Sequence, residues 1–235
     1  LMDRATAHGR AAMPQPGMVP ARALHAGVHS EAESKAYLAG YGLPVTQEQV
    51  VGSADAAVAA ASRIGYPVAL KVSSAEIAHK SDAGGVILGL KDEAALRAAA
   101  KTMADRFPGA AMLVQQMVGG GLELIVGAQR SRATGPVLML GIGGVFAEVL
   151  NDVVFCRAPA SVEAVRAALG RLRSQRLMDG YRGAPPVDRD AVAAIGARLS
   201  EIIAANESIA EVDLNPVIAR QSGAVIVDAL IRVEE

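Results

Sequence analysis

The chain has 235 residues, with 23 Lys and Arg against 24 Asp and Glu, for a formal net charge of −1. This balance excludes the basic surface of a nucleic-acid-binding protein and the polybasic segments that bind anionic membranes. The single cysteine, Cys156, excludes a disulfide or a thiolate zinc site made within the chain, and no apolar run approaches the roughly 20 residues of a membrane span. We therefore expect a cytoplasmic globular protein with an aliphatic core.

The first 29 residues differ from the rest of the sequence, because they contain three of the four histidines and show no sustained periodicity. We expect a tail there that is either flexible throughout or ordered in part. Regular structure is predicted to begin at Ser30, which can form a capping box with Glu33 and open a helix that Gly40 and Gly42 end.

A repeated order of strand, helix and strand follows. Helices are predicted from Ser53 to Ile64 and from Asp92 to Phe107, each opened by a capping side chain. Strands are predicted at residues 45–51, 67–72, 86–90 and 111–116. This order is typical of a split βαβ, or ferredoxin-like, unit whose helices pack on one face of a sheet.

The second half of the chain has a different pattern. Ser161 is predicted to cap a helix that ends at Leu169, and Asp188 or Asp190 to open another. Strands are predicted at residues 122–128, 136–140, 211–214 and 224–227, with a loop and strand over 145–155. The sequence thus indicates a mixed α+β or α/β chain in three parts: a tail (1–29), a smaller lobe with its leading helix (30–116) and a larger lobe (117–235).

Lys71 interrupts an apolar strand. Burying an ammonium group without a partner is unfavourable. The lysine therefore either turns to solvent by strand alternation, with its stem along apolar surface, or points into a cleft where it meets an anion.

The segment after this strand is polar. His79 and Lys80 stand together in it, and Gly84 and Gly85 precede the next strand. Free N–H groups in a glycine-rich turn can cradle phosphate oxygens, and a lysine adds positive charge. The pattern favours an anion-binding loop, although a glycine pair alone also fits a simple turn. A second glycine-rich segment, 141–148, fits either a binding loop or a plain connection between strands.

Acidic and apolar residues alternate near the C-terminus. The period of two places Glu211, Asp213 and Asn215 on one face of a strand. Together with Asp228, which we expect on the next strand, these oxygen ligands suit a hard cation such as Mg²⁺ bound with phosphates. The alternative is a solvated strand face.

Six segments, taken together and in this order, resemble the ATP-grasp domain of the NDP-forming (ADP-forming) acyl-CoA synthetases. They are PVALKV (67–72), HKSDAGGV (79–86), LVQQMVGGGLELIVGA (113–128), GIGGVFAEVLNDV (141–153), GYRGAPPVD (180–188) and EVDLNP (211–216). In the two-subunit members this domain is the β subunit, and the chain is also similar to the succinyl-CoA synthetase β chain. The resemblance covers roughly residues 30–235. It implies an ATP-grasp fold, in which a ferredoxin-like small lobe and a larger α+β lobe hold a nucleotide between them.

The resemblance also implies roles for the matching residues. Lys71 would contact the nucleotide phosphates, the backbone of residues 115–118 would meet the adenine edge, and Glu123 would bind the ribose hydroxyls. The residues implied in ATP or ADP binding are Lys71, Lys80, Gly84, Gly85, Gln115, Gln116, Met117, Val118 and Glu123. The implied Mg²⁺ ligands are Asp213, Asn215 and Asp228. Arg182 is a weaker match, and the family's hinge often carries an acid where the two glutamines stand.

His79 matches the histidine that, in this family, takes a phosphoryl group from a histidine of the partner subunit and delivers it to ADP. The implied function is the nucleotide-binding subunit of an acid–CoA ligase (ADP-forming). It would work with a CoA-binding α subunit in an α2β2-like complex. One alternative is a non-catalytic, nucleotide-sensing module that regulates a partner acyltransferase and has no need of His79. Another is a stand-alone ligase that uses an acyl-phosphate.

Overall fold

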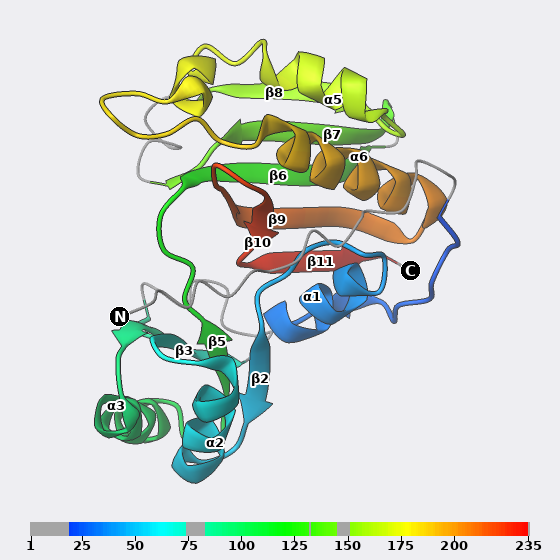
Figure 1. Cartoon of the computed structure of the whole chain (residues 1–235). Coiled ribbons are helices and arrows are strands. Elements are labelled where there is room, and N and C mark those ends of the chain that lie inside the picture. The colour runs from blue at the N-terminus through cyan, green and yellow to red at the C-terminus, as the bar shows by residue number, and fades with distance from the viewer. Residues whose placement is uncertain (1–18, 74–82, 132, 145–150, 235) are drawn as a thin grey trace.

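The computed structural model describes residues 19–73, 83–131, 133–144 and 151–234, which form two lobes built on antiparallel sheets. Figure 1 shows the larger sheet above and the smaller lobe below, joined by the link between β5 and β6. The predicted two-lobed α+β architecture is confirmed. Among the described residues, no helix is long and apolar enough to cross a membrane.

The smaller sheet has the strand order β2-β5-β3-β4. Its strands are β2 (Glu48–Val51), β3 (Val68–Ser73), β4 (Val86–Leu90) and β5 (Ala111–Gln116), and its helices are α2 (Ala54–Ile64) and α3 (Glu93–Arg106). Each strand–helix–strand unit is split by a strand of the other unit, as the sequence predicts. Both helices pack against the same face of the sheet and form one apolar cluster with it. The opposite face of the sheet is free of these two helices.

The helices of the smaller lobe begin where their capping side chains predict. Ser53 Oγ accepts a hydrogen bond from Ala56 N at 3.2 Å, and Asp92 Oδ1 accepts one from Ala95 N at 2.8 Å. These bonds satisfy backbone N–H groups that have no partner within the first turn. Helix formation here is therefore a local consequence of the sequence.

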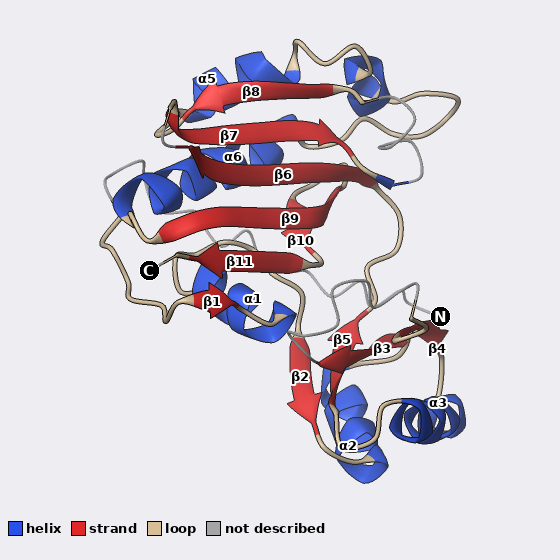
Figure 2. Cartoon of the chain, turned by 180° about the vertical axis from the view of Figure 1, so that it is seen from behind, coloured by secondary structure: helices blue, strands red, loops and turns tan. Residues whose placement is uncertain are grey.

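The larger sheet has the strand order β1-β11-β9-β6-β7-β8, with β10 paired to β9. Its strands are β1 (Gly27–Val28), β6 (Leu122–Ser131), β7 (Gly135–Ile142), β8 (Val153–Arg157), β9 (Ile209–Ala219), β10 (Ala224–Ile226) and β11 (Ala229–Val233). The helical elements are α5 (Val162–Leu169), the 3₁₀ helix η2 (Gln175–Asp179) and α6 (Arg189–Ala205). Helices α5 and α6 cover one face of this sheet, and Figure 2 shows the opposite face.

The C-terminal strands differ from the prediction. β9 runs for 11 residues and continues past Pro216, and β11 was not predicted. Asp228 lies between β10 and β11 rather than on a strand, so that placement was wrong. Even so, Asn215 N donates to Asp228 O at 3.2 Å, and the two residues face each other at the end of the β9–β11 ladder.

Helix α1 (Glu31–Ala39) begins at the predicted capping box of Ser30 and Glu33. We expected it with the smaller lobe, but Leu38 is buried in the same apolar cluster as the larger sheet. Ser34 Oγ also accepts a hydrogen bond from Ile231 N of β11 at 3.1 Å. The reason is that α1 packs against β11, a strand that the sequence did not reveal.

Residues 1–18 of the expected tail lie outside the described residues. The remainder, residues 19–29, is held against the larger lobe. Strand β1 pairs with β11, and Arg22 N donates to Asn206 Oδ1 at 2.9 Å. These long-range bonds have no local sequence signature.

Candidate functional site

The two lobes meet around Lys71 of β3. Lys71 is only 5% exposed, so the alternative of a solvent-facing lysine is wrong. Its Nζ donates to Glu31 Oε1 at 2.6 Å and to Asp228 Oδ2 at 3.3 Å. Burial alone would lower the pKa of Lys71, but the Asp228 and Glu31 carboxylates outweigh burial and raise it. A charged ammonium therefore lies at the junction of the two lobes.

Asp213, Asn215 and Asp228 lie on the sheet face that α5 and α6 leave uncovered. Leu214, between the first two, points into the core with its cross-strand partner Ala229, and the strand alternation turns its neighbours the other way. Burial, followed by the negative charges of Glu211 and Asp228, raises the pKa of Asp213 to about 6. The predicted acidic face therefore exists.

This donor set fits magnesium held with phosphates. Among the described residues, no group of three or more His, Cys, Asp or Glu side chains is arranged to hold a metal ion by itself. Mg²⁺ commonly uses one or two carboxylates and takes its remaining ligands from phosphates and water. Asn215 and Asp228 are neighbours on adjacent segments through the backbone hydrogen bond between them, so an amide and a carboxylate are available for such a site.

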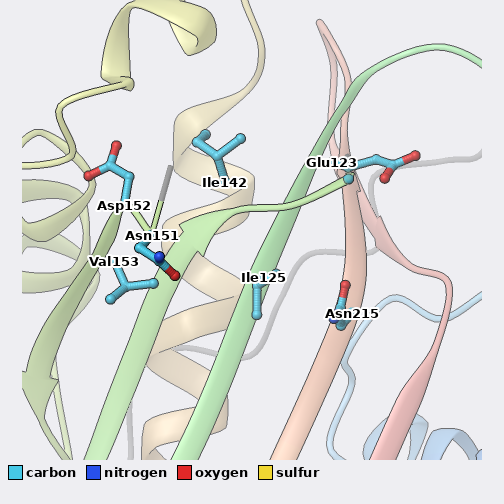
Figure 3. A pocket seen from close by; sticks show the side chains of 8 residues that line it. Glu123, Ile125, Ile142, Asn151, Asp152, Val153 and Asn215 are labelled. Carbon is cyan, nitrogen blue, oxygen red and sulfur yellow. The ribbon is translucent and has the colours of Figure 1, made fainter. Parts of the chain in front are cut away.

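A cavity of about 430 Å³ opens on the same face, and both Glu123 and Asn215 line it (Figure 3). Its lining residues are Glu123, Ile125, Ile142, Gly144, Asn151, Asp152, Val153 and Asn215. The backbone near Glu123 is fixed, because Gly143 N donates to Glu123 O at 2.8 Å. The second glycine-rich segment thus contributes to a cavity, although its residues 145–150 lie outside the described part.

Asp152 was missed by sequence reasoning. It is 8% exposed, and its carboxylate accepts hydrogen bonds from Arg173 N at 3.1 Å and from Ser174 N at 2.7 Å. It therefore fixes the loop before η2 against the end of the cavity. The polar pair Asn151-Asp152, directly before an apolar strand, was the available signal.

The hinge residues lie where β5 leaves the smaller sheet. Gln115 is 1% exposed, and its Nε2 donates to Thr46 Oγ1 at 2.7 Å and to Val227 O at 2.6 Å. Gln116 Oε1 accepts from Gln47 N at 3.4 Å. Met117 and Val118 follow, half-buried, in the link to β6. The side chain of Gln115 is thus engaged within the protein, and the expected adenine contact rests on backbone atoms.

The predicted phosphate loop is described only at its end. His79 and Lys80 lie outside the described residues. Gly85 O accepts a hydrogen bond from Val72 N at 2.8 Å, and Gly84 has a φ of +68°, a conformation that favours glycine. Lys71 of β3 pairs with Val86, the first residue of β4. The two glycines directly precede Val86 and therefore lead into the strand that pairs with Lys71.

A second cavity, of about 450 Å³, adjoins the link between the lobes. Gly119 to Leu122 line it from one side, and Tyr181, Pro185 and Arg220 from others. Arg182 is not among its lining residues, since its guanidinium lies over the Tyr181 ring at 5.4 Å in an exposed position.

A model of the ATP-grasp domain matches residues 21–233. The chain belongs to the ATP-grasp family. It is 36% identical to the β subunit of acetate–CoA ligase (ADP-forming) I of Pyrococcus furiosus, over 85% of this chain and 89% of that subunit. It is 38% identical to 4-hydroxybutyrate–CoA ligase (ADP-forming) of Nitrosopumilus maritimus, over 82% of this chain but 29% of the ligase. The chain therefore spans less than a third of the length of that ligase.

The solved structures agree with this membership. A chain of the dinucleotide-forming acetyl-CoA synthetase 1 of Ca. Korarchaeum cryptofilum, in complex with coenzyme A, Ca-AMPCP and HgCl⁺, matches with a TM-score of 0.85 and 38% identity, over 88% of this chain and 93% of that one. The same protein in complex with coenzyme A and Mg-AMPPCP, its phosphohistidine segment pointing towards the nucleotide-binding site, matches with a TM-score of 0.79 and 39% identity, over 87% of this chain and 92% of that one. The ATP-grasp resemblance of the six motifs is thus confirmed at the level of fold and family.

Proposed function

We propose that this ATP-grasp chain binds ATP or ADP for an ADP-forming acyl-CoA synthetase. The observation that carries the proposal is the convergence of a buried, charged Lys71 with Asp228 and Asn215 at the junction of the lobes. This combination provides one cation for phosphate oxygens and two oxygen ligands for a divalent cation. The nucleotide and magnesium in the Korarchaeum protein, a close structural match, support the same reading.

Each group of residues has a separate task in this proposal. Lys71, with Gly84 and Gly85, neutralises and orients the phosphates, while the backbone of residues 115–118 holds the base. Glu123, which lines the 430 Å³ cavity, binds the ribose hydroxyls. Asp213, Asn215 and Asp228 would hold Mg²⁺, which, when bound, offsets phosphate charge. Phosphoryl transfer needs little covalent help from the protein, so positioning and charge neutralisation are the chain's main contributions.

The phosphoryl group would pass between the nucleotide and His79. A CoA-binding partner would couple that transfer to the interconversion of a carboxylic acid and its CoA thioester. The similarity to a separately named β subunit supports a two-component arrangement, for which we propose an α2β2-like complex.

Thermal unfolding with and without nucleotide tests the binding role. ADP or ATP with Mg²⁺ should raise the melting temperature, because a ligand at 100 times its Kd adds about 2.7 kcal/mol to the stability of the folded state. Lys71→Met should reduce this shift, measured from the variant's own ligand-free melting temperature. Lys101→Met, on the exposed surface of α3, is the matched control and should leave the shift unchanged.

Three results bear on the proposal. A large shift in Mg²⁺ that shrinks in EDTA supports a metal-assisted phosphate site. Equal shifts for the two lysine variants would remove Lys71 from the site. The absence of any shift in the folded wild-type chain at millimolar nucleotide would refute nucleotide binding itself.

A further inference from the structure

Glu31, in the first turn of α1, is a buried acid that the sequence did not single out. Its side chain is 2% exposed, and its Oε1 accepts hydrogen bonds from two ammonium groups. Lys71 Nζ lies 2.6 Å away and Lys35 Nζ lies 3.1 Å away. Burial of a carboxylate is costly unless opposite charges compensate it, and here two lysines do so.

Lys35 fixes this carboxylate from behind. It is 1% exposed, forms an ion pair with Glu48, and donates to Thr46 Oγ1 at 3.0 Å and to Val227 O at 2.7 Å. An ammonium has three N–H donors, and buried partners on several segments surround this one. Charges therefore alternate along a row that is largely buried over Glu48, Lys35, Glu31 and Lys71 and ends at the partly exposed Asp228.

The same row holds the segment that carries Asp228. Val227 O accepts from Lys35 Nζ and also from Gln115 Nε2, at 2.7 and 2.6 Å. Asp228 thus directly follows a carbonyl group that is hydrogen-bonded to both α1 and β5. The buried polar groups behind the site therefore set the position of its carboxylate as well as that of Lys71.

The two carboxylates beside Lys71 differ in exposure. The Glu31 side chain is 2% exposed and lies on the inner side of the lysine, whereas the Asp228 side chain is 39% exposed and lies on its solvent side. The shorter of the two contacts is the inner one. Asp228 is therefore the carboxylate of the two that an incoming phosphate or metal can reach, while Glu31 is covered.

We propose that Glu31 is a positioning residue, which, with Lys35 behind it, holds the Lys71 ammonium aimed at the nucleotide phosphates. This inference rests on the proposed nucleotide binding and adds a residue that touches no ligand. A lysine has a flexible stem, so a fixed inner anchor reduces the ordering that phosphate binding must impose. Without Glu31, the Lys71 ammonium would lose the shorter of its two ion-pair contacts and its inner anchor.

Binding of ADP and of adenosine, both in Mg²⁺, separates this role from general stability. Adenosine has the base and ribose but no phosphate for Lys71. Glu31→Gln keeps the shape and removes the charge, so it should weaken ADP binding by about tenfold or more and leave the adenosine response unchanged. Calorimetry gives the ADP affinity, and the thermal shift at saturating adenosine gives the second value.

Two further variants complete the design. Glu33→Gln makes the same chemical change in the same helical turn and can retain the capping box, so it should bind ADP as the wild type does. Glu31→Asp keeps the charge but shortens the anchor by one methylene, so its ADP affinity should lie between those of the wild type and Glu31→Gln. If Glu31→Gln does not fold, the aspartate variant decides the matter alone.

Wild-type ADP affinity in Glu31→Gln, or in Glu31→Asp where only that variant folds, would overturn the inference. So would equal losses for ADP and adenosine, which indicate a structural role only. A wild-type chain that binds no ADP would instead contradict the proposed function, so the two failures are distinguishable.

Discussion

Lys71 illustrates how far residue-level reasoning extends. The sequence identifies it as an anomaly in an apolar strand, but strand alternation suggests a solvent-facing side that does not exist, because β3 is buried on both faces from Val68 to Val72. Its partners, Glu31 and Asp228, stand 40 and 157 positions away in the chain. No local pattern predicts contacts of that separation.

Gln115 shows that a residue's position can be predicted from the sequence even when its partners cannot. Its position in the motif predicted a hinge, and the structure places it at the end of β5 as expected. Its buried amide is engaged with Thr46 and Val227, a use that motif matching does not suggest. The position of a hinge can be predicted from sequence, whereas the partner of a buried amide depends on the assembled fold.

The Asp152 carboxylate should make a pH-dependent contribution to stability. Its burial tends to raise the pKa, but the hydrogen bonds from Ser174 and Arg173 dominate and lower it. A carboxyl whose folded-state pKa is depressed stabilises the protein above its unfolded pKa, and that stability is lost as the pH falls through the folded value. Asp152→Asn should therefore cost about 1–3 kcal/mol near neutral pH.

Urea unfolding at a series of pH values checks this expectation. The difference between wild type and Asp152→Asn should be constant near neutrality and narrow as the pH falls below the ordinary aspartate pKa of about 3.9. Asp105→Asn, on the exposed surface of α3, is a control that should change little. A gap that widens on acidification would contradict the assignment of the hydrogen bonds.

At the scale of elements, helices and strands differed in predictability. The helices α2, α3, α5 and α6 begin at residues whose side chains cap them, and such signals lie within four positions. Strand β11 has no such signal, and its pairing with β9 and β1 is set by the tertiary fold. Because α1 packs on β11, the missing strand also concealed where that helix belongs.

Helix α6 depends on one small residue for its close packing. A Cβ atom added at Gly196 would lie 2.9 Å from Val165 Cγ1 of α5 and 3.3 Å from Leu138 Cδ2 of β7. Gly196→Val should therefore force these side chains apart and destabilise the chain by about 1–3 kcal/mol. The urea midpoint should fall accordingly.

Ala194→Val is the matched control for this change. It introduces the same β-branched residue into the same helix at a half-buried position. Because valine has a lower helix propensity than alanine but a higher one than glycine, propensity alone predicts that Ala194→Val destabilises the chain and that Gly196→Val does not. A Gly196→Val variant at least as stable as the wild type would therefore show that the α5–α6 contact tolerates the added volume.

For the whole molecule, the order of six motifs predicted more than any single one. A glycine pair, a buried lysine and an acidic strand each fit an ordinary structural role. Together they support the proposed nucleotide site, because the fold joins β3 to Asp228 and places the start of β6 beside Asn215. The packing of α1 and the row of charges behind Lys71 could not be predicted, since both require the three-dimensional arrangement of the lobes.

The phosphoryl relay is the property that distinguishes an enzyme subunit from a nucleotide-sensing module. His79 lies outside the described residues, and its role is a proposal from the motif that surrounds it. A neutral imidazole, with an ordinary pKa near 6.5, can accept a phosphoryl group at physiological pH. The bond from the γ-phosphorus to the β,γ-bridging oxygen would break, ADP would leave, and a bond from phosphorus to the ring nitrogen would form.

His79→Ala should therefore bind ADP with nearly wild-type affinity but acquire no acid-labile, base-stable phosphate from γ-labelled ATP. With the CoA-binding partner supplied, the variant should also form no acyl-CoA. His25→Ala, which changes an exposed histidine of the N-terminal segment, should retain the label. Full labelling and activity in His79→Ala would refute the relay, because the phosphoryl group would then have another route. Nucleotide binding by the wild type without any labelling, even with the partner present, would favour the sensing module, since a covalent acceptor is the one feature that only the enzyme requires.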